Sequence, residues 1–207
     1  MTASSVPVVF SAVPTLFGPG GELDPDANRA LYKLVGGLVD GLFVAGTTGE
    51  FPALEDAERL ALFELALAEA GPDRVIAHIG APDARHASRL ARAAVALGAT
   101  RIAAITPYYL PARPDELAAH FRRIREAVPA PELYAALCRD PAEQERLDRV
   151  VALGASIGRL KHALQFRGLV SGFSPAARMT VDPPDAETAA AIAAQVAAVI
   201  GSLPNHA

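Results

Sequence analysis

Four short apolar segments recur in the first half of the chain, and each is followed by a stretch with the spacing of a helix. They begin near residues 8, 42, 75 and 102. A strand and a helix that repeat at intervals of about 30 residues are typical of a parallel sheet, because parallel strands need a crossover connection. The rhythm therefore predicts a (β/α)8 barrel or a doubly wound sheet. In both folds ligands bind at the carboxyl ends of the strands.

The stretches between these strands carry helix signals of their own. Asp24 before Pro25 predicts an N-cap followed by a proline at the first helical position. Gly71, followed by Pro72, and Gly98 are natural helix ends. The predicted helices cover about residues 25–39, 55–70, 84–97 and 115–127.

After Pro129 this rhythm fails. The predicted helices there lie at 131–153, in two pieces, at 157–169 and at 185–200. No segment from 130 to 207 has the pattern of a buried strand. We therefore expect an incomplete (β/α)8 barrel of about four βα units in residues 1–129, with a C-terminal helical segment, residues 130–207, packed on it.

Composition narrows the class of partner. The net charge of -4 provides no basic surface, so neither nucleic acid nor an anionic membrane is expected as a partner. No apolar run approaches the roughly 18 residues of a membrane span, and no leader peptide is recognised. The single cysteine, Cys138, fits a reducing compartment. We expect a soluble cytoplasmic protein without a metal site, in which His78 is an interior histidine of the third strand.

The most informative single stretch is Gly41-Leu-Phe-Val-Ala-Gly-Thr-Thr-Gly-Glu-Phe-Pro52. An apolar strand ends at Gly46, two hydroxyl side chains follow, and Gly49 permits a tight turn. Thr47 and Thr48 can offer hydroxyls and backbone N–H groups to an anion such as the carboxylate of a small oxo acid. An ordinary strand-to-helix turn would have the same spacing, so these residues alone leave both interpretations open.

Three short motifs, read in order, resemble one enzyme family. They are Ser11-Ala-Val-Pro-Thr-Leu-Phe17, Gly46-Thr-Thr-Gly-Glu50 and Thr106-Pro-Tyr-Tyr109. With them the chain resembles the dihydrodipicolinate synthase and N-acetylneuraminate lyase family from about residue 8 to residue 127. The resemblance implies a (β/α)8 barrel with extra C-terminal helices, usually assembled as a tetramer, and the chemistry of a class I aldolase. In that chemistry a lysine forms a Schiff base with pyruvate or a related 2-oxo acid, and no cofactor is needed.

Carried over by position, the resemblance gives roles to residues of two motifs. Thr48, close to Gly46 in the substrate-binding loop, is similar to the residue that binds the substrate carboxylate, and Thr47 to the hydroxyl of the proton relay. Tyr109 resembles the relay tyrosine that reaches into a neighbouring subunit's site, whereas Tyr108 is expected to pack. Hydroxyl groups can carry protons to and from an imine without placing a charge in a dry pocket. The implied partners are a pyruvate-like 2-oxo acid and other copies of the chain.

The lysine of the Schiff base is harder to match. The chain has only two amines to offer, Lys33 within the first predicted helix and Lys161. In one alignment Tyr134 and Lys161 stand for the family's tyrosine of strand five and lysine of strand six, since their separation is close to the family's. In the other, residues 160–172 resemble the C-terminal helix and the loop that follows it. We favour the second alignment because it continues further along the chain.

The favoured alignment predicts that strands five to eight are missing between about residues 129 and 131. Loss of half a barrel would leave strand edges and core-facing side chains without partners. Three interpretations of function follow. The chain is an aldolase-type lyase that uses Lys161, a non-catalytic relative that binds a 2-oxo acid or a full-length relative, or a structural remnant. The last two together are favoured over the first.

Overall fold

The computed structural model describes residues 8–108 and 112–128, the backbone of 132–134, and scattered positions further along the chain. These later positions are 161, 164–165, 170, 172–174, 178, 186–187, 190–191 and 193–194. The chain divides into two compact units, and each is described by itself. The first unit comprises residues 1–15 and 28–135, and the second comprises residues 16–27 and 136–207.

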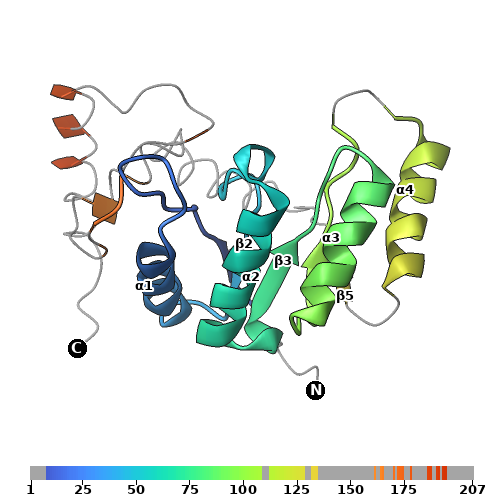
Figure 1. Cartoon of the computed structure of the whole chain (residues 1–207), viewed down its shortest axis with the longest axis horizontal. Coiled ribbons are helices and arrows are strands. Elements are labelled where there is room, and N and C mark those ends of the chain that lie inside the picture. The colour runs from blue at the N-terminus through green and yellow to red at the C-terminus, as the bar shows by residue number, and fades with distance from the viewer. Residues whose placement is uncertain are drawn as a thin grey trace, which may run out of the picture. The chain divides into compact units, whose positions relative to one another are not determined.

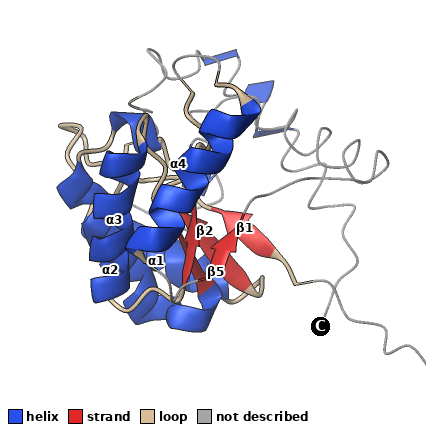
Figure 2. Cartoon of the chain, turned by 90° about the vertical axis from the view of Figure 1, so that its right-hand side faces the viewer, coloured by secondary structure: helices blue, strands red, loops and turns tan. Residues whose placement is uncertain are grey.

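The first unit contains a five-stranded parallel sheet in which the order along the sheet is the order along the chain. Its strands are β1 (Phe10–Ala12), β2 (Gly41–Val44), β3 (Val75–His78), β4 (Arg101–Ala103) and β5 (Glu132–Tyr134). The helices are α1 (Pro25–Gly36), α2 (Asp56–Ala70), α3 (Ala84–Ala96) and α4 (Pro114–Ala127), with short 3-10 turns at Phe51–Ala53 and Pro72–Arg74. Figures 1 and 2 show α2, α3 and α4 on one face of the sheet. The parallel βα order predicted from the sequence is confirmed.

Successive side chains along a strand point to opposite faces, and the two faces of this sheet differ in burial. On one face the apolar side chains of β2, β3 and β4 are only 0–1% exposed, and Ser11 of β1, which pairs with Leu42, is half-buried. These apolar side chains are Leu42, Val44, Val75, Ala77 and Ile102. The other face carries Phe10, Phe43, Ile76, His78 and Arg101. Phe10, Phe43 and Arg101 are only half-buried. We assign the fully buried set to the face beneath the helices and the mixed set to the face that a closed barrel encloses.

The predicted cap at Asp24 is confirmed, and the structure adds a cap at Asp83 that was not predicted. Asp24 Oδ1 accepts a hydrogen bond of 2.9 Å from the N–H of Ala27, and Asp83 Oδ1 accepts bonds of 2.9 and 3.0 Å from two backbone N–H groups of α3. Gly98, with φ of 99°, follows α3 in a conformation that favours glycine. The first helix ends at Gly36, before the predicted end near 39. Among the described residues, no helix is long and apolar enough to cross a membrane.

The fifth strand corrects a prediction. The sequence pattern gives no strand after residue 130, yet β5 pairs in parallel with β4, with Arg101 opposite Glu132 and Ala103 opposite Tyr134. A strand of three residues is too short to show periodicity, and it becomes recognisable only through its neighbour. Strand five is therefore present. The prediction that strands five to eight are missing between residues 129 and 131 is wrong for strand five.

The second unit is described at fewer positions. Phe17 forms isolated antiparallel bridges with Leu23 and with Ser174, and the guanidinium of Arg178 donates to the carbonyl oxygen of Gly21 at 2.6 and 3.0 Å. The helices predicted over 157–169 and 185–200 agree with the structure wherever it describes them. The helical positions are 161, 164–165, 186–187, 190–191 and 193–194. The helix predicted to begin at 131 is wrong at 132–134, where the structure has β5, and the rest of the prediction for 131–153 lies outside the described residues.

Candidate functional site at the carboxyl edge of the sheet

The loop that follows β2, residues 45–51, carries the two predicted threonines, and we call it the threonine loop. Gly46 is buried, Thr47 is exposed and Thr48 is half-buried. The N–H of Glu50 donates to the Thr47 carbonyl at 3.0 Å, and the N–H of Phe51 donates to the Gly46 carbonyl at 3.2 Å. The threonines thus lie at the accessible tip of a loop whose two ends are bonded to each other.

The threonine loop is also conformationally unusual. Ala45 has φ of 51° and Glu50 has φ of 58°, and they are the described non-glycine residues with positive φ. Such left-handed conformations are sparse for residues with a side chain and are concentrated at functional loops. At Gly49 a Cβ atom would lie 2.8 Å from the Ala45 Cα, so no side chain fits there without movement of the backbone. The loop therefore has a tightly defined backbone.

A residue of the first motif holds the threonine loop from the side of β1. Thr15 is 1% exposed, and its Oγ1 donates a hydrogen bond of 2.7 Å to the Gly49 carbonyl. This bond joins two of the motifs on which the family resemblance depends. It explains physically why a hydroxyl residue follows β1 at this place, because the buried carbonyl of the loop needs a donor.

His78, at the end of β3, holds the threonine loop from the other side. The predicted interior position is confirmed, since the side chain is 4% exposed. Its Nδ1 lies 2.9 Å from the Ala45 carbonyl, and because a carbonyl only accepts, Nδ1 carries the proton. Burial, helped by the nearby positive charge of Arg59, lowers the pKa of His78 to about 4, although the bond to Ala45 opposes this. The imidazole is therefore neutral at neutral pH, with Nε2 unprotonated.

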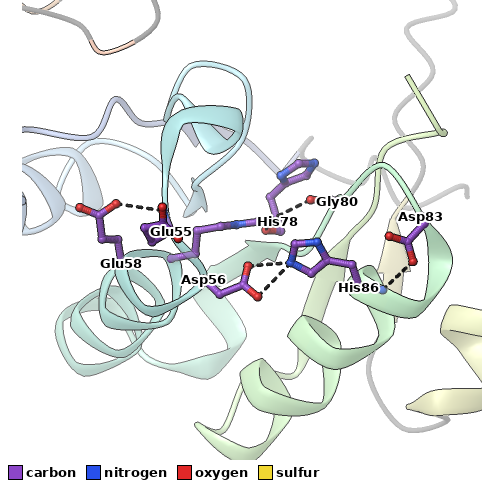
Figure 3. Close-up of polar contacts among 8 residues, drawn as sticks. Glu55, Asp56, Glu58, His78, Gly80, Asp83 and His86 are labelled. Carbon is purple, nitrogen blue, oxygen red and sulfur yellow. Dashed lines mark hydrogen bonds and ion pairs between the residues drawn. The ribbon is translucent and has the colours of Figure 1, made fainter. Parts of the chain in front are cut away.

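Arg59 of α2 belongs to the same region and was not predicted from the sequence. Its NH1 donates to the Gly80 carbonyl at 3.0 Å and its NH2 to the His78 carbonyl at 2.5 Å. Its Cζ lies 5.5 Å from the centroid of the Phe51 ring. Burial lowers its pKa to about 10, against the favourable charge of Asp56, so it stays charged at neutral pH. Figure 3 shows His78 and Gly80 at the end of β3, with a dashed line to the Gly80 carbonyl.

A second polar contact in Figure 3 lies outside this network. The Nε2 of His86, on α3, is 2.7 and 2.9 Å from the two carboxylate oxygens of Asp56 at the start of α2. Both side chains are partly exposed, so the contact links two helices rather than lining the threonine loop. Among the residues that the structure describes, no three histidine, cysteine or acidic side chains form a group that could hold a metal ion.

The residues after β4 are described only in part. Tyr108, which was expected to pack, is 43% exposed, and its ring meets the Phe51 ring edge-on with centroids 5.7 Å apart, so it is packed on one side alone among the described contacts. Tyr109, the predicted relay tyrosine, lies outside the described residues. The threonine loop and Tyr108 are therefore brought together through Phe51, while the role of Tyr109 stays a prediction.

The two lysines have very different environments. Lys33 is exposed on α1. Lys161 belongs to the second unit, where it is buried and its Nζ lies 4.4 Å from the centroid of the Phe17 ring. The Cζ of Arg178 lies 4.1 Å from the same centroid. Tyr134, the partner that one alignment gives to Lys161, ends β5, and its backbone pairs with Ala103.

Comparison with known proteins decides the family. The model of the Dihydrodipicolinate synthetase family matches residues 6–135, which include all five strands and the whole threonine loop. The chain belongs to this family. Membership confirms the resemblance seen in the three motifs, and the match reaches one strand further than the sequence pattern indicated.

Curated relatives of this dihydrodipicolinate synthetase family member are named 4-hydroxy-tetrahydrodipicolinate synthase. 4-hydroxy-tetrahydrodipicolinate synthase 1 of Streptomyces coelicolor is 39% identical over 147 residues, which are 70% of this chain and 48% of the relative. The synthase of Kineococcus radiotolerans is 41% identical over 148 residues, 69% of this chain and 48% of the relative. The chain thus spans about half the length of the curated relatives it matches.

Solved structures of the family give the same result. Dihydrodipicolinate synthase from Cyanidioschyzon merolae with lysine bound has a TM-score of 0.59 and 28% identity, covering 61% of this chain and 44% of that one. A prophage protein of the dihydrodipicolinic acid synthase family from E. coli K12, in complex with pyruvate, has a TM-score of 0.57 and 31% identity, covering 64% and 46%. A sialic acid aldolase from Ruminococcus gnavus has a TM-score of 0.57 and 27% identity, covering 61% and 42%. The sheet described here is accordingly part of the family's (β/α)8 barrel.

Proposed function

We propose that this chain binds the carboxylate of a small 2-oxo acid such as pyruvate at the threonine loop, without forming a covalent bond to it. The observation that carries the proposal is the geometry of the loop. Thr47 and Thr48 lie between two left-handed residues, and the loop is fixed by Thr15 on one side and by the His78 ring on the other. A loop ordered before the ligand arrives loses less conformational entropy on binding.

The chemistry of the threonines suits a carboxylate. Each hydroxyl can donate one hydrogen bond, and consecutive backbone N–H groups in a tight turn add further donors for an anion. The E. coli relative that was solved in complex with pyruvate supports a ligand of this class. Family membership supports the same proposal, because the family model matches residues 6–135, which include the threonine loop.

The surroundings of the two lysines support binding without catalysis. Formation of a Schiff base requires a neutral amine that attacks the carbonyl carbon, after which water leaves. Lys161 belongs to the second unit, where it is buried and its Nζ lies 4.4 Å from the centroid of the Phe17 ring. Lys33 is exposed on α1, away from the strand ends. We therefore assign no amine of this chain to the ligand.

A second candidate function is that of an aldolase-type lyase in which Lys161 forms the Schiff base and Thr47, Tyr109 and Tyr134 carry protons. The observation that favours it is β5, because Tyr134 ends the fifth strand next to β4 as the alternative alignment requires. In either case we propose a homo-oligomer or a complex with a full-length relative in the cytoplasm. Both β1 and β5 are edges of the described sheet and could pair with another chain.

Titration of the purified chain with pyruvate tests the proposal. We expect saturable binding that Thr48→Val removes and Thr47→Val weakens. Thr100→Val is the matched control, because the Thr100 hydroxyl donates to the Pro72 carbonyl just before β4, at the opposite end of the sheet. Absence of pyruvate binding by the unchanged chain, or equal loss in the control, would refute the proposed site.

Reduction with borohydride in the presence of pyruvate separates the two candidates. The non-covalent proposal predicts no added mass on any peptide. A reduced adduct on the peptide that contains Lys161, lost in Lys161→Arg and kept in Lys33→Arg, would establish the lyase candidate in its place.

A further inference from the structure

The threonine loop begins where β2 leaves β3. The last pair in the register of these strands is Val44 with Ala77, and at the next residue, Ala45, the chain turns into the left-handed region. Beyond that point the carbonyls of His78 and Gly80 receive hydrogen bonds from Arg59. A guanidinium presents several donors in one plane, so it can bind two carbonyls of an extended chain as a neighbouring strand would.

The same guanidinium also contacts the closing turn of the loop. Arg59 Cζ lies 5.5 Å from the centroid of the Phe51 ring, and the N–H of Phe51 donates to the Gly46 carbonyl. The Phe51 ring further meets the rings of His78, at 4.6 Å, and Tyr108, at 5.7 Å between centroids. Arg59 is therefore one of three groups that hold the Phe51 ring, and Phe51 carries the backbone N–H that closes the loop.

We propose that Arg59 is a positioning residue that holds the threonine loop and the Tyr108 stretch in place at the carboxyl edge. Only one of its tests, the measurement of pyruvate affinity, rests on the proposed function. Arg59 is 3% exposed, and within the described part of the chain its Nε has no hydrogen-bond partner. Burial of an incompletely bonded charge opposes folding. We therefore assign to the guanidinium the ordering of the loop, rather than a net gain in stability.

Arg74, in the 3-10 turn before β3, provides a matched control. Its guanidinium likewise donates to backbone carbonyls, those of Gly36, Val39 and Asp40. It precedes β3, whereas the carbonyls bound by Arg59 lie at the other end of that strand. Arg74→Met thus removes the same kind of contact without touching the threonine loop.

Amide hydrogen exchange measured by NMR tests the inference without a ligand. In Arg59→Met we expect the N–H groups of Glu50 and Phe51 to exchange about tenfold faster or more, because a hydrogen bond from a charged donor is worth at least that factor. The amides of β2 should change much less. Arg74→Met should leave the Glu50 and Phe51 amides unchanged. Unchanged exchange of these two amides in folded Arg59→Met would overturn the inference.

Two further measurements keep the test decisive. If Arg59→Met does not fold, Arg59→Lys keeps the charge and the apolar stem but cannot bind both carbonyls as a planar fork, and it should still accelerate exchange at Phe51. Unchanged exchange there would again overturn the inference. Pyruvate affinity should fall in the Arg59 variants and not in Arg74→Met. If the unchanged chain binds no pyruvate, the proposed function fails, while the exchange data still decide the role of Arg59.

Discussion

Protonation of His78 should destabilise the folded chain in mildly acidic solution. The ordinary histidine pKa of 6.5 applies to the unfolded chain, and burial near Arg59 lowers the folded value to about 4. Between these values the unfolded chain binds a proton that the folded chain does not. The contribution of neutral His78 to the free energy of unfolding is therefore fully present above pH 6.5 and is lost as the pH falls towards 4. Since each unit of pH corresponds to about 1.4 kcal/mol per proton, acidification from pH 6.5 to about pH 4 should lower the free energy of unfolding by about 3 kcal/mol.

Urea unfolding at a series of pH values between 7 and 4.5 measures this effect. His78→Asn is the informative variant, because its amide can still donate to the Ala45 carbonyl but does not titrate. The variant should have a lower free energy of unfolding at pH 7 and a shallower dependence on pH, by up to about 1.4 kcal/mol per pH unit. Burial also lowers the pKa of His120, so His120→Gln measures that second contribution separately. Equal pH dependence in the unchanged chain and in His78→Asn would refute the reasoning.

Three smaller predictions concern the framework of the site. Gly80→Ala should lower the free energy of unfolding by about 1–3 kcal/mol, because a Cβ there would lie 2.6 Å from the His78 ring, and urea unfolding measures it. Thr15→Val should cost about 1–3 kcal/mol by leaving the buried Gly49 carbonyl without its donor, and it should weaken pyruvate binding in the same titration as Thr48→Val. Asp83→Ala should cost about 1 kcal/mol through loss of the α3 cap, without a change in pyruvate affinity; an equal loss of affinity would contradict the assignment of that residue to the framework alone.

The predicted part of the fold consists of elements with a strong local signal. The helices have caps at Asp24 and Asp83 or stop at a glycine such as Gly98, and the apolar strands recur at regular intervals, so periodicity and propensity agree. β5 was not predicted, because a strand of three residues is too short to show an alternating pattern of its own. It is stabilised by pairing with β4, which is a contact with residues far away in the sequence.

The candidate site likewise contains residues that the local sequence identifies and residues that it does not. The two threonines were identified from the local sequence, because glycines and hydroxyl residues after a strand have a direct chemical meaning. Arg59 gave no such signal, since an arginine in a helix is usually on the surface. The available clue was its spacing in α2: Arg59 lies three and four residues before Leu62 and Phe63, so it shares the apolar side of the helix with them.

The sequence by itself determined the βα rhythm, the family and the identity of the threonine loop, because each of these is encoded in neighbouring residues. The tertiary structure alone decided how the loop is held. Thr15, Arg59 and His78 come from different parts of the chain, and their hydrogen bonds to backbone carbonyls exist only once the strands lie side by side. Carbonyl groups are the same in every residue, so no sequence pattern shows which of them will need a partner when a strand ends.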